Sequence, residues 1–224
     1  MKWMACAMGM LLGGSAAVRC GAAEAHVAVV ESWLAAATNL VTWQAAFTQT
    51  RHLAALKNPL VSTGQVWFAA PDSFRWELGG AGQSIAMRSG TELMVLSPRF
   101  KRAERYRLEP GAPGPMQDAL ALLDTGFPRS QGDFARRFEV AGVETNGPLV
   151  VLRLRPRNPG AQRMMPAMAV ELDPAGWLLK GTELTFADGS RMRNVFTSVI
   201  TNGPVSAELF RTNLDSGWKV GETR

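Results

Sequence analysis

The sequence predicts a mainly β protein, built on one continuous antiparallel sheet of ten or eleven strands that curls, with two small helical pieces. Three observations predict this class. Short stretches in which apolar and polar residues alternate follow one another from Val41 onwards. Turn residues separate these stretches, as in Gly79-Gly80 and Asp188-Gly189. No internal repeat and no linker richer in Ser or Gly than these turns divides the chain, so a single sheet is favoured over two domains.

The N-terminal residues are typical of a secretory signal peptide over residues 1–23. Lys2 supplies a positive start, and residues 4–18 are apolar but too few to span a bilayer comfortably. Gly21-Ala22-Ala23 or Ala23-Glu24-Ala25 then offers the small-x-small pattern of a cleavage site. We therefore expect an exported protein in which residues 24–224 form a single domain.

Both cysteines of the chain, Cys6 and Cys20, precede the expected mature start near Glu24 or His26. The mature protein would then hold no disulfide, thiol nucleophile or cysteine-metal site. A lipid anchor on Cys20 is the alternative. It is disfavoured by Arg19, because lipoprotein signals have a small residue at that place.

The first mature residues predict a helix over 24–38, and a strand follows it. Apolar residues recur there at helical spacing on one face, namely Val27, Val30, Trp33, Leu34 and Ala37. From Val41 the period changes to two, because Trp43, Ala45 and Phe47 alternate with mostly polar neighbours. This pattern predicts a strand with one apolar face.

Further strands are predicted at residues 64–69, 74–78, 84–88, 92–97, 101–108, 137–144, 149–155, 167–172, 177–186 and 191–200. Residues 110–128 interrupt them with Pro and Gly at their ends and a helical core, in which Met116, Leu120 and Leu123 share a face. We expect this piece to be a movable lid. Two short helices cannot fill the concave side of so large a sheet, so the sequence indicates an apolar cavity.

Catalytic motifs are few. With His26 and His52 as the two histidines and no cysteine after residue 20, a His/Cys zinc site cannot be assembled. No Gly-x-Ser-x-Gly motif presents a nucleophile, and residues 79–82 join two strands, so they offer no helix N-terminus to a phosphate. We expect no catalytic residue, metal or cofactor. A secreted hydrolase would need an acid/base pair that converges in the cavity.

The densest charge cluster is basic and covers residues 99–107. Lys101, Arg102 and Arg105 are candidates for a patch that meets anionic lipid headgroups or a partner protein. The alternative is a solvent-facing edge strand whose charges discourage aggregation. The formal net charge is only +5, and export takes the chain away from nucleic acid, so nucleic-acid binding is not expected.

Large aromatic residues gather between positions 43 and 76 in a recognisable spacing. Residues 43–50 read Trp-Gln-Ala-Ala-Phe-Thr-Gln-Thr, and the segment that follows places Gly64, Trp67, Pro71, Phe74 and Trp76 in order. This combination resembles the family of periplasmic outer-membrane lipoprotein carriers, LolA. The match is dense over residues 43–98 and looser afterwards.

The resemblance implies an incomplete barrel of about 11 strands, closed by the N-terminal helix and the central helical lid, which shields the acyl chains of lipoproteins. It implies loading by a lipoprotein-releasing ABC transporter in the inner membrane, and unloading to an outer-membrane acceptor. We expect a monomer in the periplasm. The expected cavity lining is Trp43, Phe47, Trp67, Phe74, Trp76, Met116, Leu120, Leu123, Met168, Leu184 and Phe186.

One residue departs from the family pattern. The better-known carriers have an arginine immediately before the proline that corresponds to Pro71. That arginine is thought to hold the lid closed, and this chain has Ala70 in its place. The resemblance also places Phe74 at the cavity mouth. Either Arg75 latches the lid instead, or the empty protein closes less tightly and a cargo such as a glycolipid becomes possible. A lipoprotein-sensing module of the same fold is a further alternative.

Overall fold

The computed structural model describes the backbone of residues 16–80, 83–108 and 130–223, and within these ranges the side chains from His26 to Glu222. The strands in these ranges are β1 (Thr42–His52), β2 (Leu60–Ala69), β3 (Ser73–Leu78), β4 (Ser84–Ser89), β5 (Glu92–Ser97), β6 (Arg102–Arg107), β7 (Phe138–Asn146), β8 (Leu149–Pro156), β9 (Ala167–Asp173), β10 (Leu178–Thr185), β11 (Arg191–Thr201) and β12 (Lys219–Thr223). The helices are α1 (Ala16–Thr38), α3 (Gln131–Arg137), α4 (Pro159–Met164) and the short 3-10 helices η1 (Pro98–Phe100) and η2 (Ala207–Phe210).

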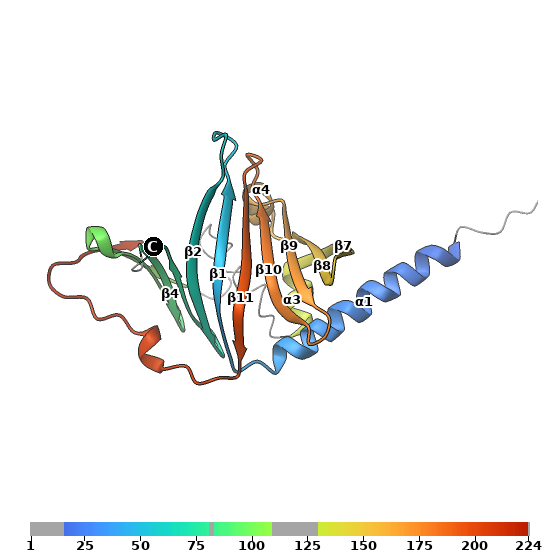
Figure 1. The fold of residues 1–224 in the computed structure, drawn as a ribbon, viewed down its shortest axis with the longest axis horizontal. Coiled ribbons are helices and arrows are strands. Elements are labelled where there is room, and N and C mark those ends of the chain that lie inside the picture. Colours follow the sequence, from blue (N-terminus) through green and yellow to red (C-terminus); the bar gives the residue numbers. More distant parts are fainter. Residues whose placement is uncertain (1–15, 81–82, 109–129, 224) are drawn as a thin grey trace, which may run out of the picture.

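All the described strands belong to one sheet that curls without closing into a barrel (Figure 1). Their order is β12-β6-β5-β4-β3-β2-β1-β11-β10-β9-β8-β7. Strand β1 pairs with both β2 and β11, and so joins two halves that are each made of successive antiparallel strands. The expected antiparallel, curled sheet is confirmed. Strand β12 was not predicted, and it pairs in parallel with β6 at one edge.

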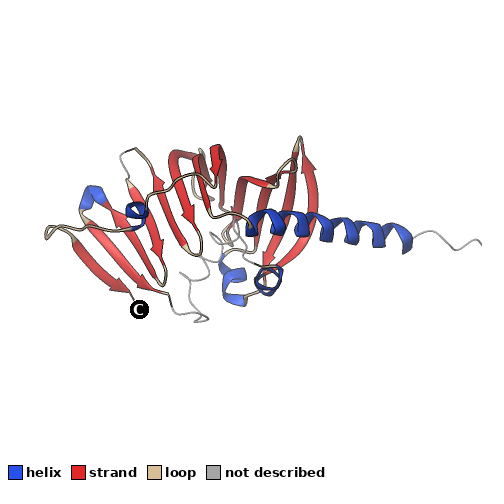
Figure 2. Ribbon diagram, turned by 90° about the horizontal axis from the view of Figure 1, so that it is seen from below, coloured by secondary structure: helices blue, strands red, loops and turns tan. Residues whose placement is uncertain are grey.

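Helix α1 covers the β7–β11 half of the sheet. It contains the predicted helix over 24–38 and begins earlier, at Ala16. Trp33 and Leu34 are buried, but Val27 is exposed, so the apolar face is shorter than predicted. The helix packs mainly against β7 and β10 and projects beyond the sheet (Figure 2). None of the described helices is long and apolar enough to cross a membrane.

Helix α3 completes this cover. Ser130 caps it by accepting a hydrogen bond from the backbone N–H of Asp133 at 3.1 Å. The ring of Phe134 then meets Trp33 of α1 edge to face, with 5.4 Å between ring centroids, and lies 5.7 Å from the ring of Phe138. The inner face of the β7–β11 half is therefore filled by side chains of α1 and α3.

The outer face of the β3–β6 half is crossed by the C-terminal strap, which we define as residues 203–218. The Nη1 of Arg75 donates to the carbonyl oxygen of Leu209 at 3.1 Å. Leu214 and Trp218 pack against the outward side chains of β4, β5 and β6, which are Ile85, Met94, Leu96 and Ala103. The strap then leads into β12, so it ties the end of the chain to the sheet edge.

The predicted lid piece, residues 110–128, lies outside the described residues, and so do its proposed lining side chains Met116, Leu120 and Leu123. Their role as lid and lining stays a prediction.

Candidate functional site

The inner face of the β3–β6 half carries a continuous apolar surface. Strand register decides its members, since Phe74 lies opposite Phe68, and Trp76 lies between Val66 and Ala86. The same face continues across β5 and β6. Its residues are Phe74, Trp76, Ala86, Leu93, Val95 and Tyr106, with Leu108 just after β6.

Part of this surface remains accessible. Phe74, Leu93 and Leu108 are buried, whereas the four side chains packed against them are only half-buried, namely Trp76, Ala86, Val95 and Tyr106. The described helices pack elsewhere, because α1 lies mainly against β7 and β10, and η2 lies against β3 and β4 on the outer face. We name these four side chains the open apolar surface.

Trp76 joins the open apolar surface to the packed core. Its ring centroid lies 4.3 Å from that of Phe47 and 6.2 Å from that of Phe196. Phe47 and Phe196 are buried in the main core, where Trp43 also lies edge to face on Phe196 at 5.2 Å. Trp43, Phe47, Phe196 and Trp76 therefore form an aromatic wall between the main core and the open apolar surface.

Most of the predicted lining residues lie on the inner face, but at different depths. Trp43 and Phe47 are fully buried, and Met168 is buried on β9 among the main core residues. Leu184 and Phe186 pack against that same core and are half-buried. Of the predicted set, Trp76 contributes to the open apolar surface, and Phe74 lies buried beside it rather than at an exposed mouth.

Trp67 does not belong to this lining. It pairs with Gln44 and Arg75, whereas its neighbours Val66 and Phe68 are buried on the inner face. Because side chains alternate along a strand, Trp67 points to the outer face. Its inclusion in the predicted cavity lining was wrong.

A buried polar row crosses the inner face close to the aromatic wall, and the sequence analysis missed it. Gln49 donates from Nε2 to Oδ1 of Asn194 at 3.0 Å, and Asn194 donates from Nδ2 to Oγ1 of Thr182 at 3.0 Å. Gln49 follows Trp43, Ala45 and Phe47 on the same face of β1, so this alternation was the available signal. The row fixes the register of β1, β11 and β10 at this level.

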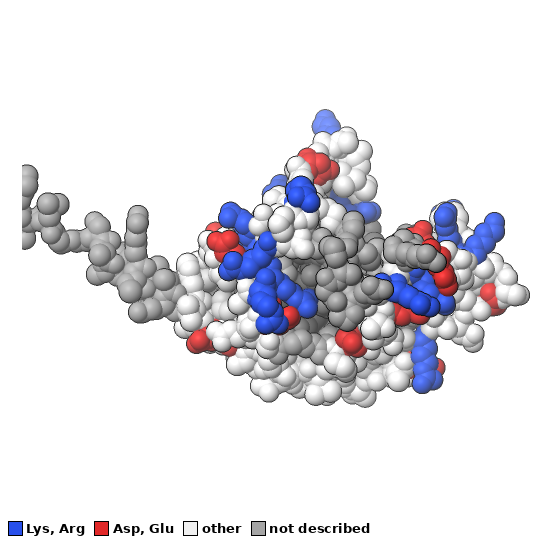
Figure 3. Space-filling view, turned by 180° about the vertical axis from the view of Figure 1, so that it is seen from behind, with Lys and Arg blue, Asp and Glu red and all other residues white. Residues whose placement is uncertain are grey.

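The three predicted patch residues do not form one basic surface. Arg102 lies on the inner side of β6 with Glu104, 3.9 Å away, whereas Arg105 points outward. Arg105 pairs with Glu92 at 3.6 Å and with Glu222 of β12 at 3.7 Å. These charges are divided between two faces and partly neutralised. Figure 3 shows how basic side chains alternate with acidic ones on the flanks of the molecule.

Lys101 is the third of these residues, and it anchors the C-terminal strap. Its Nζ lies 3.3 Å from Oδ2 of Asp215, and its carbonyl oxygen accepts a hydrogen bond from the N–H of Lys219 at 2.8 Å. The N–H of Gly217 and the ammonium of Lys101 hold the pKa of Asp215 below its ordinary value. Lys101 and Arg105 thus contact the C-terminal segment.

Ala70 lies where the family has its lid-latching arginine, and Arg75 is the alternative latch that the sequence analysis proposes. Ala70 is exposed, and its backbone N–H donates to the carbonyl oxygen of Val41. The guanidinium of Arg75 lies on the outer face, where it donates to Oε1 of Glu77 at 2.5 Å and to the carbonyl oxygen of Leu209. The described contacts of Arg75 therefore hold the C-terminal strap rather than a cover of the inner face.

The described residues hold no cluster of three or more His, Cys, Asp or Glu side chains that could bind a metal. His52 is exposed at the end of β1, and Glu77 and Glu92 lie in ion pairs at the strand surfaces. The inner face thus offers apolar area and a few satisfied polar groups. Its chemistry is that of binding an apolar group.

Comparison with known protein families identifies the fold. Residues 38–213 match the family described as outer membrane lipoprotein carrier protein LolA, and this range includes all the described strands except β12. The chain belongs to the LolA family. No curated protein sequence matches the chain significantly.

Solved structures resemble this LolA family member at low sequence identity. A crystal structure of an uncharacterized conserved protein from Thermus thermophilus has 11% identity and a TM-score of 0.52, covering 89% of this chain and 99% of that chain. A LolA superfamily protein from Nitrosomonas europaea has 9% identity and a TM-score of 0.43, with coverages of 83% and 97%. The lipoprotein LppX of Mycobacterium tuberculosis has 13% identity and a TM-score of 0.40, with coverages of 86% and 99%.

Proposed function

We propose that this LolA family member is a periplasmic carrier that shields the acyl chains of lipoproteins. The observation that supports the proposal is the open apolar surface of Trp76, Ala86, Val95 and Tyr106, which lies on the concave side of the sheet. Family membership supports the same interpretation. The acyl chains would lie along β3–β6, with the aromatic wall at Trp76 as the end of their path.

The physical chemistry of the cargo requires such a surface but no reaction. Moving an acyl chain through water costs about 0.8 kcal/mol for each exposed CH₂ group, so an unshielded chain does not leave a membrane at a useful rate. An apolar surface removes most of this cost. Release then needs only a receiver that binds the cargo more tightly, because ligand populations follow differential affinity.

The carrier role implies a location and a set of partners. A signal peptide over residues 1–23, as the sequence predicts, would direct the chain to the periplasm. A lipoprotein-releasing ABC transporter of the inner membrane would load the carrier, and an outer-membrane acceptor would receive the lipoprotein. The carrier would act as a monomer, since one inner face suffices to cover the cargo.

A second function is favoured by one specific observation. Ala70 stands where the better-known carriers have the arginine that is thought to latch the lid, and its methyl group can form no side-chain hydrogen bond. A protein without this latch suits a lipid or glycolipid that is taken up without a tightly closed state. A lipoprotein-sensing module with the same inner face is related to this alternative, and it would bind cargo without passing it on.

Native mass spectrometry of the protein isolated from the periplasm tests the proposal. A mass increment that matches an acylated peptide or lipoprotein supports the carrier, and one that matches a glycolipid supports the second function. If the protein is free of lipid and takes up nothing from lipoprotein-loaded membranes, both functions are wrong. A sensing module would bind the lipoprotein in this experiment and then fail to deliver it to acceptor membranes.

A further inference from the structure

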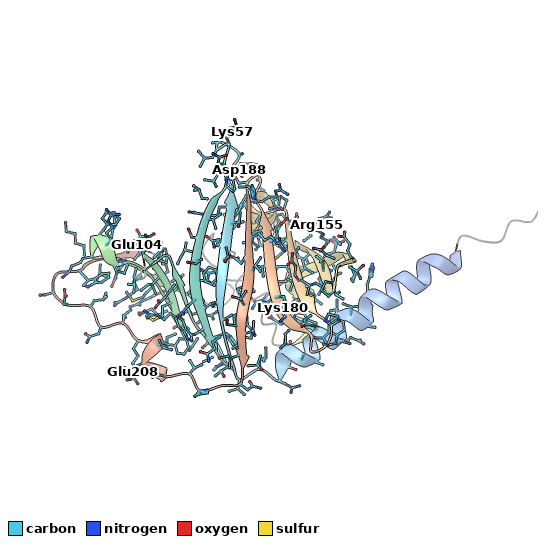
Figure 4. All side chains as sticks on the ribbon, in the orientation of Figure 1. Lys57, Glu104, Arg155, Lys180, Asp188 and Glu208 are labelled. Atoms are coloured by element: carbon cyan, nitrogen blue, oxygen red, sulfur yellow. The ribbon has the colours of Figure 1, made fainter. Side chains whose placement is uncertain are left out.

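The connections between strands gather at two opposite ends of the sheet, and one end carries a protruding hairpin. The β1–β2 hairpin extends beyond the other connections, and Lys57 lies at its outermost point (Figure 4). The neighbouring β10–β11 turn, which contains Asp188, supports the base of this hairpin on the same end of the sheet. We name residues 53–61 the hairpin tip.

The hairpin tip exposes large apolar side chains. Leu56 is 48% exposed, Leu60 is 41% exposed and Val61 is 62% exposed. They lie on a narrow projection, and not on a broad, flat face. Because side chains alternate along a strand, Leu60 and Val61 point to opposite sides of this projection, so apolar side chains are exposed on both of its sides. Exposed apolar residues concentrated on one projection mark a contact surface, whereas single ones scattered over a protein need no explanation.

Hydrogen bonds hold the hairpin tip in a defined conformation. The N–H of Ala54 donates to Oγ of Ser190 at 3.0 Å, and this hydroxyl in turn donates to Oδ2 of Asp188 at 2.9 Å. Within the tip, the N–H of Leu56 donates to the carbonyl oxygen of Leu53 at 2.9 Å. These bonds tie the β1–β2 hairpin to the β10–β11 turn and hold Leu56 outward.

The charges around the hairpin tip are mainly positive. Residues 49–63 contain the basic residues Arg51 and Lys57 and no acidic residue. Across the sheet His52 lies opposite Arg191, which is also exposed. Asp188 is the acidic side chain of the adjoining turn, and its carboxylate is engaged with Ser190. The exposed apolar residues are thus surrounded by an excess of cations.

We propose that the hairpin tip docks on the surface of a bilayer that contains anionic phospholipids. Leu56, Leu60 and Val61 would enter the boundary between headgroups and acyl chains, while Lys57 stays among the anionic headgroups. A stable protein partner needs about 800 Å² on each side, which a narrow tip does not offer. The inference does not depend on the cargo of the inner face, because it concerns how the molecule approaches a membrane.

Vesicle flotation tests this docking. The purified protein, free of cargo, is mixed with vesicles of phosphatidylethanolamine and phosphatidylglycerol, or with vesicles of phosphatidylcholine alone. We expect the protein to float with the anionic vesicles, and the double change Leu56→Ser with Val61→Ser to weaken binding at least about tenfold. Lys57→Glu should weaken it at least about fivefold, since each basic residue near the surface contributes about that factor.

A matched control replaces two exposed apolar residues elsewhere. Val195 is 38% exposed and Ile200 is 50% exposed, and both lie on β11 away from the hairpin tip. The double change Val195→Ser with Ile200→Ser should leave flotation unchanged. The expected signal peptide, residues 1–23, is itself largely apolar, so the unchanged protein and every variant are prepared as the chain from residue 24.

A local probe settles whether the tip itself enters the bilayer. The chain from residue 24 contains no cysteine, so an environment-sensitive fluorophore can be attached through Leu56→Cys or, as a control, through Ile200→Cys. Anionic vesicles should shift the emission of the first label to the blue and leave the second unchanged. Equal shifts at both positions, no shift at position 56, or equal binding to neutral vesicles would overturn the proposal. If the tip variants lose lipoprotein transfer while the unchanged protein binds no vesicles, the tip contacts a protein partner, and the membrane proposal is wrong as well.

Discussion

The ring of Phe47 in β1 lies directly over the α-carbon of Gly64, its partner in the neighbouring strand β2. A β-carbon at position 64 would lie only 2.7 Å from Cε1 of Phe47 and would also overlap the carbonyl oxygen of Glu77. The missing side chain lets the Phe47 ring reach across β2 to Trp76 in β3, with 4.3 Å between ring centroids. The glycine at position 64 is therefore what allows the ring of Phe47 to contact Trp76.

The first prediction follows from this contact. Gly64→Ala should lower the free energy of unfolding by about 1–3 kcal/mol, because the core must move to admit the methyl group. Urea denaturation followed by circular dichroism measures this. Gly142→Ala is the matched control, since a β-carbon at that strand glycine would meet nothing within 4 Å, and it should change stability little. Similar stabilities for the two variants would contradict the proposed role of Gly64.

Alternation of apolar residues predicted those strands in which one face is clearly apolar. Residues 92–97 form β5 with the predicted bounds, and the pattern of Trp43, Ala45 and Phe47 places all three on the buried face of β1. Alternation failed at Trp67, because Val66, Trp67 and Phe68 are all large and apolar, and period two cannot be read from such a run. The register with β1 was needed to decide which of them point inward.

Elements that depend on distant contacts were missed. Strand β12 is short and polar, and it is stabilised by pairing with β6, which no local pattern indicates. Alternation along residues 101–107 already divides their charges between two faces, but their acidic partners Asp215 and Glu222 could not be predicted, because these come from the C-terminal end of the chain. Helix α4 did carry a local signal, because Asn158 caps it and Pro159 opens it.

The second prediction tests the open apolar surface. Val95→Glu should lower the uptake of lipoprotein from loaded membranes at least about tenfold, because a carboxylate on the acyl path must be desolvated when cargo binds. Val195→Glu makes the same change on the outer face of β11, where the side chain is already exposed, and should leave uptake unchanged. Equal uptake by both variants would place the acyl chains elsewhere.

The third prediction distinguishes a side chain that stabilises the core, Trp43, from one that lines the cargo-binding surface, Trp76. Trp43 is 1% exposed and packs edge to face on Phe196, so Trp43→Ala should lower the free energy of unfolding by about 3–5 kcal/mol. Trp76→Ala should reduce lipoprotein uptake with a smaller loss of stability, since Trp76 is half-buried. Denaturant unfolding and the uptake assay are measured on both proteins. A Trp43→Ala variant that is as stable as the unchanged protein but fails in uptake would show that Trp43 lines the cargo-binding surface instead.

The fourth prediction concerns a buried charge. Glu171 is buried on the outer side of β9, and its carboxylate accepts hydrogen bonds from Nη2 of Arg193 at 2.8 and 2.9 Å. Arg193→Met should lower stability by about 1–2 kcal/mol, less than for a fully buried pair because Arg193 is 42% exposed. Adding Glu171→Gln should recover part of the loss. Additive losses in this double-mutant cycle would show that the pair is not coupled.

The fifth prediction links pH to the support of the hairpin tip. Hydrogen bonds from the N–H and Oγ of Ser190 lower the pKa of Asp188 below its ordinary value of 3.8. Because the folded-state pKa is depressed, the contribution of Asp188 is complete above the ordinary value and is lost as the pH falls through the depressed one. The N–H of Ala54 should therefore keep its hydrogen-exchange protection, after correction for the intrinsic rate, from neutral pH down to about pH 4 and lose it below.

Asp188→Ala should lose this protection already at neutral pH, whereas Asp188→Asn, which retains an acceptor for the Ser190 N–H, should keep part of it. Unchanged protection of Ala54 in Asp188→Ala would mean that Ser190 holds the hairpin tip without the carboxylate.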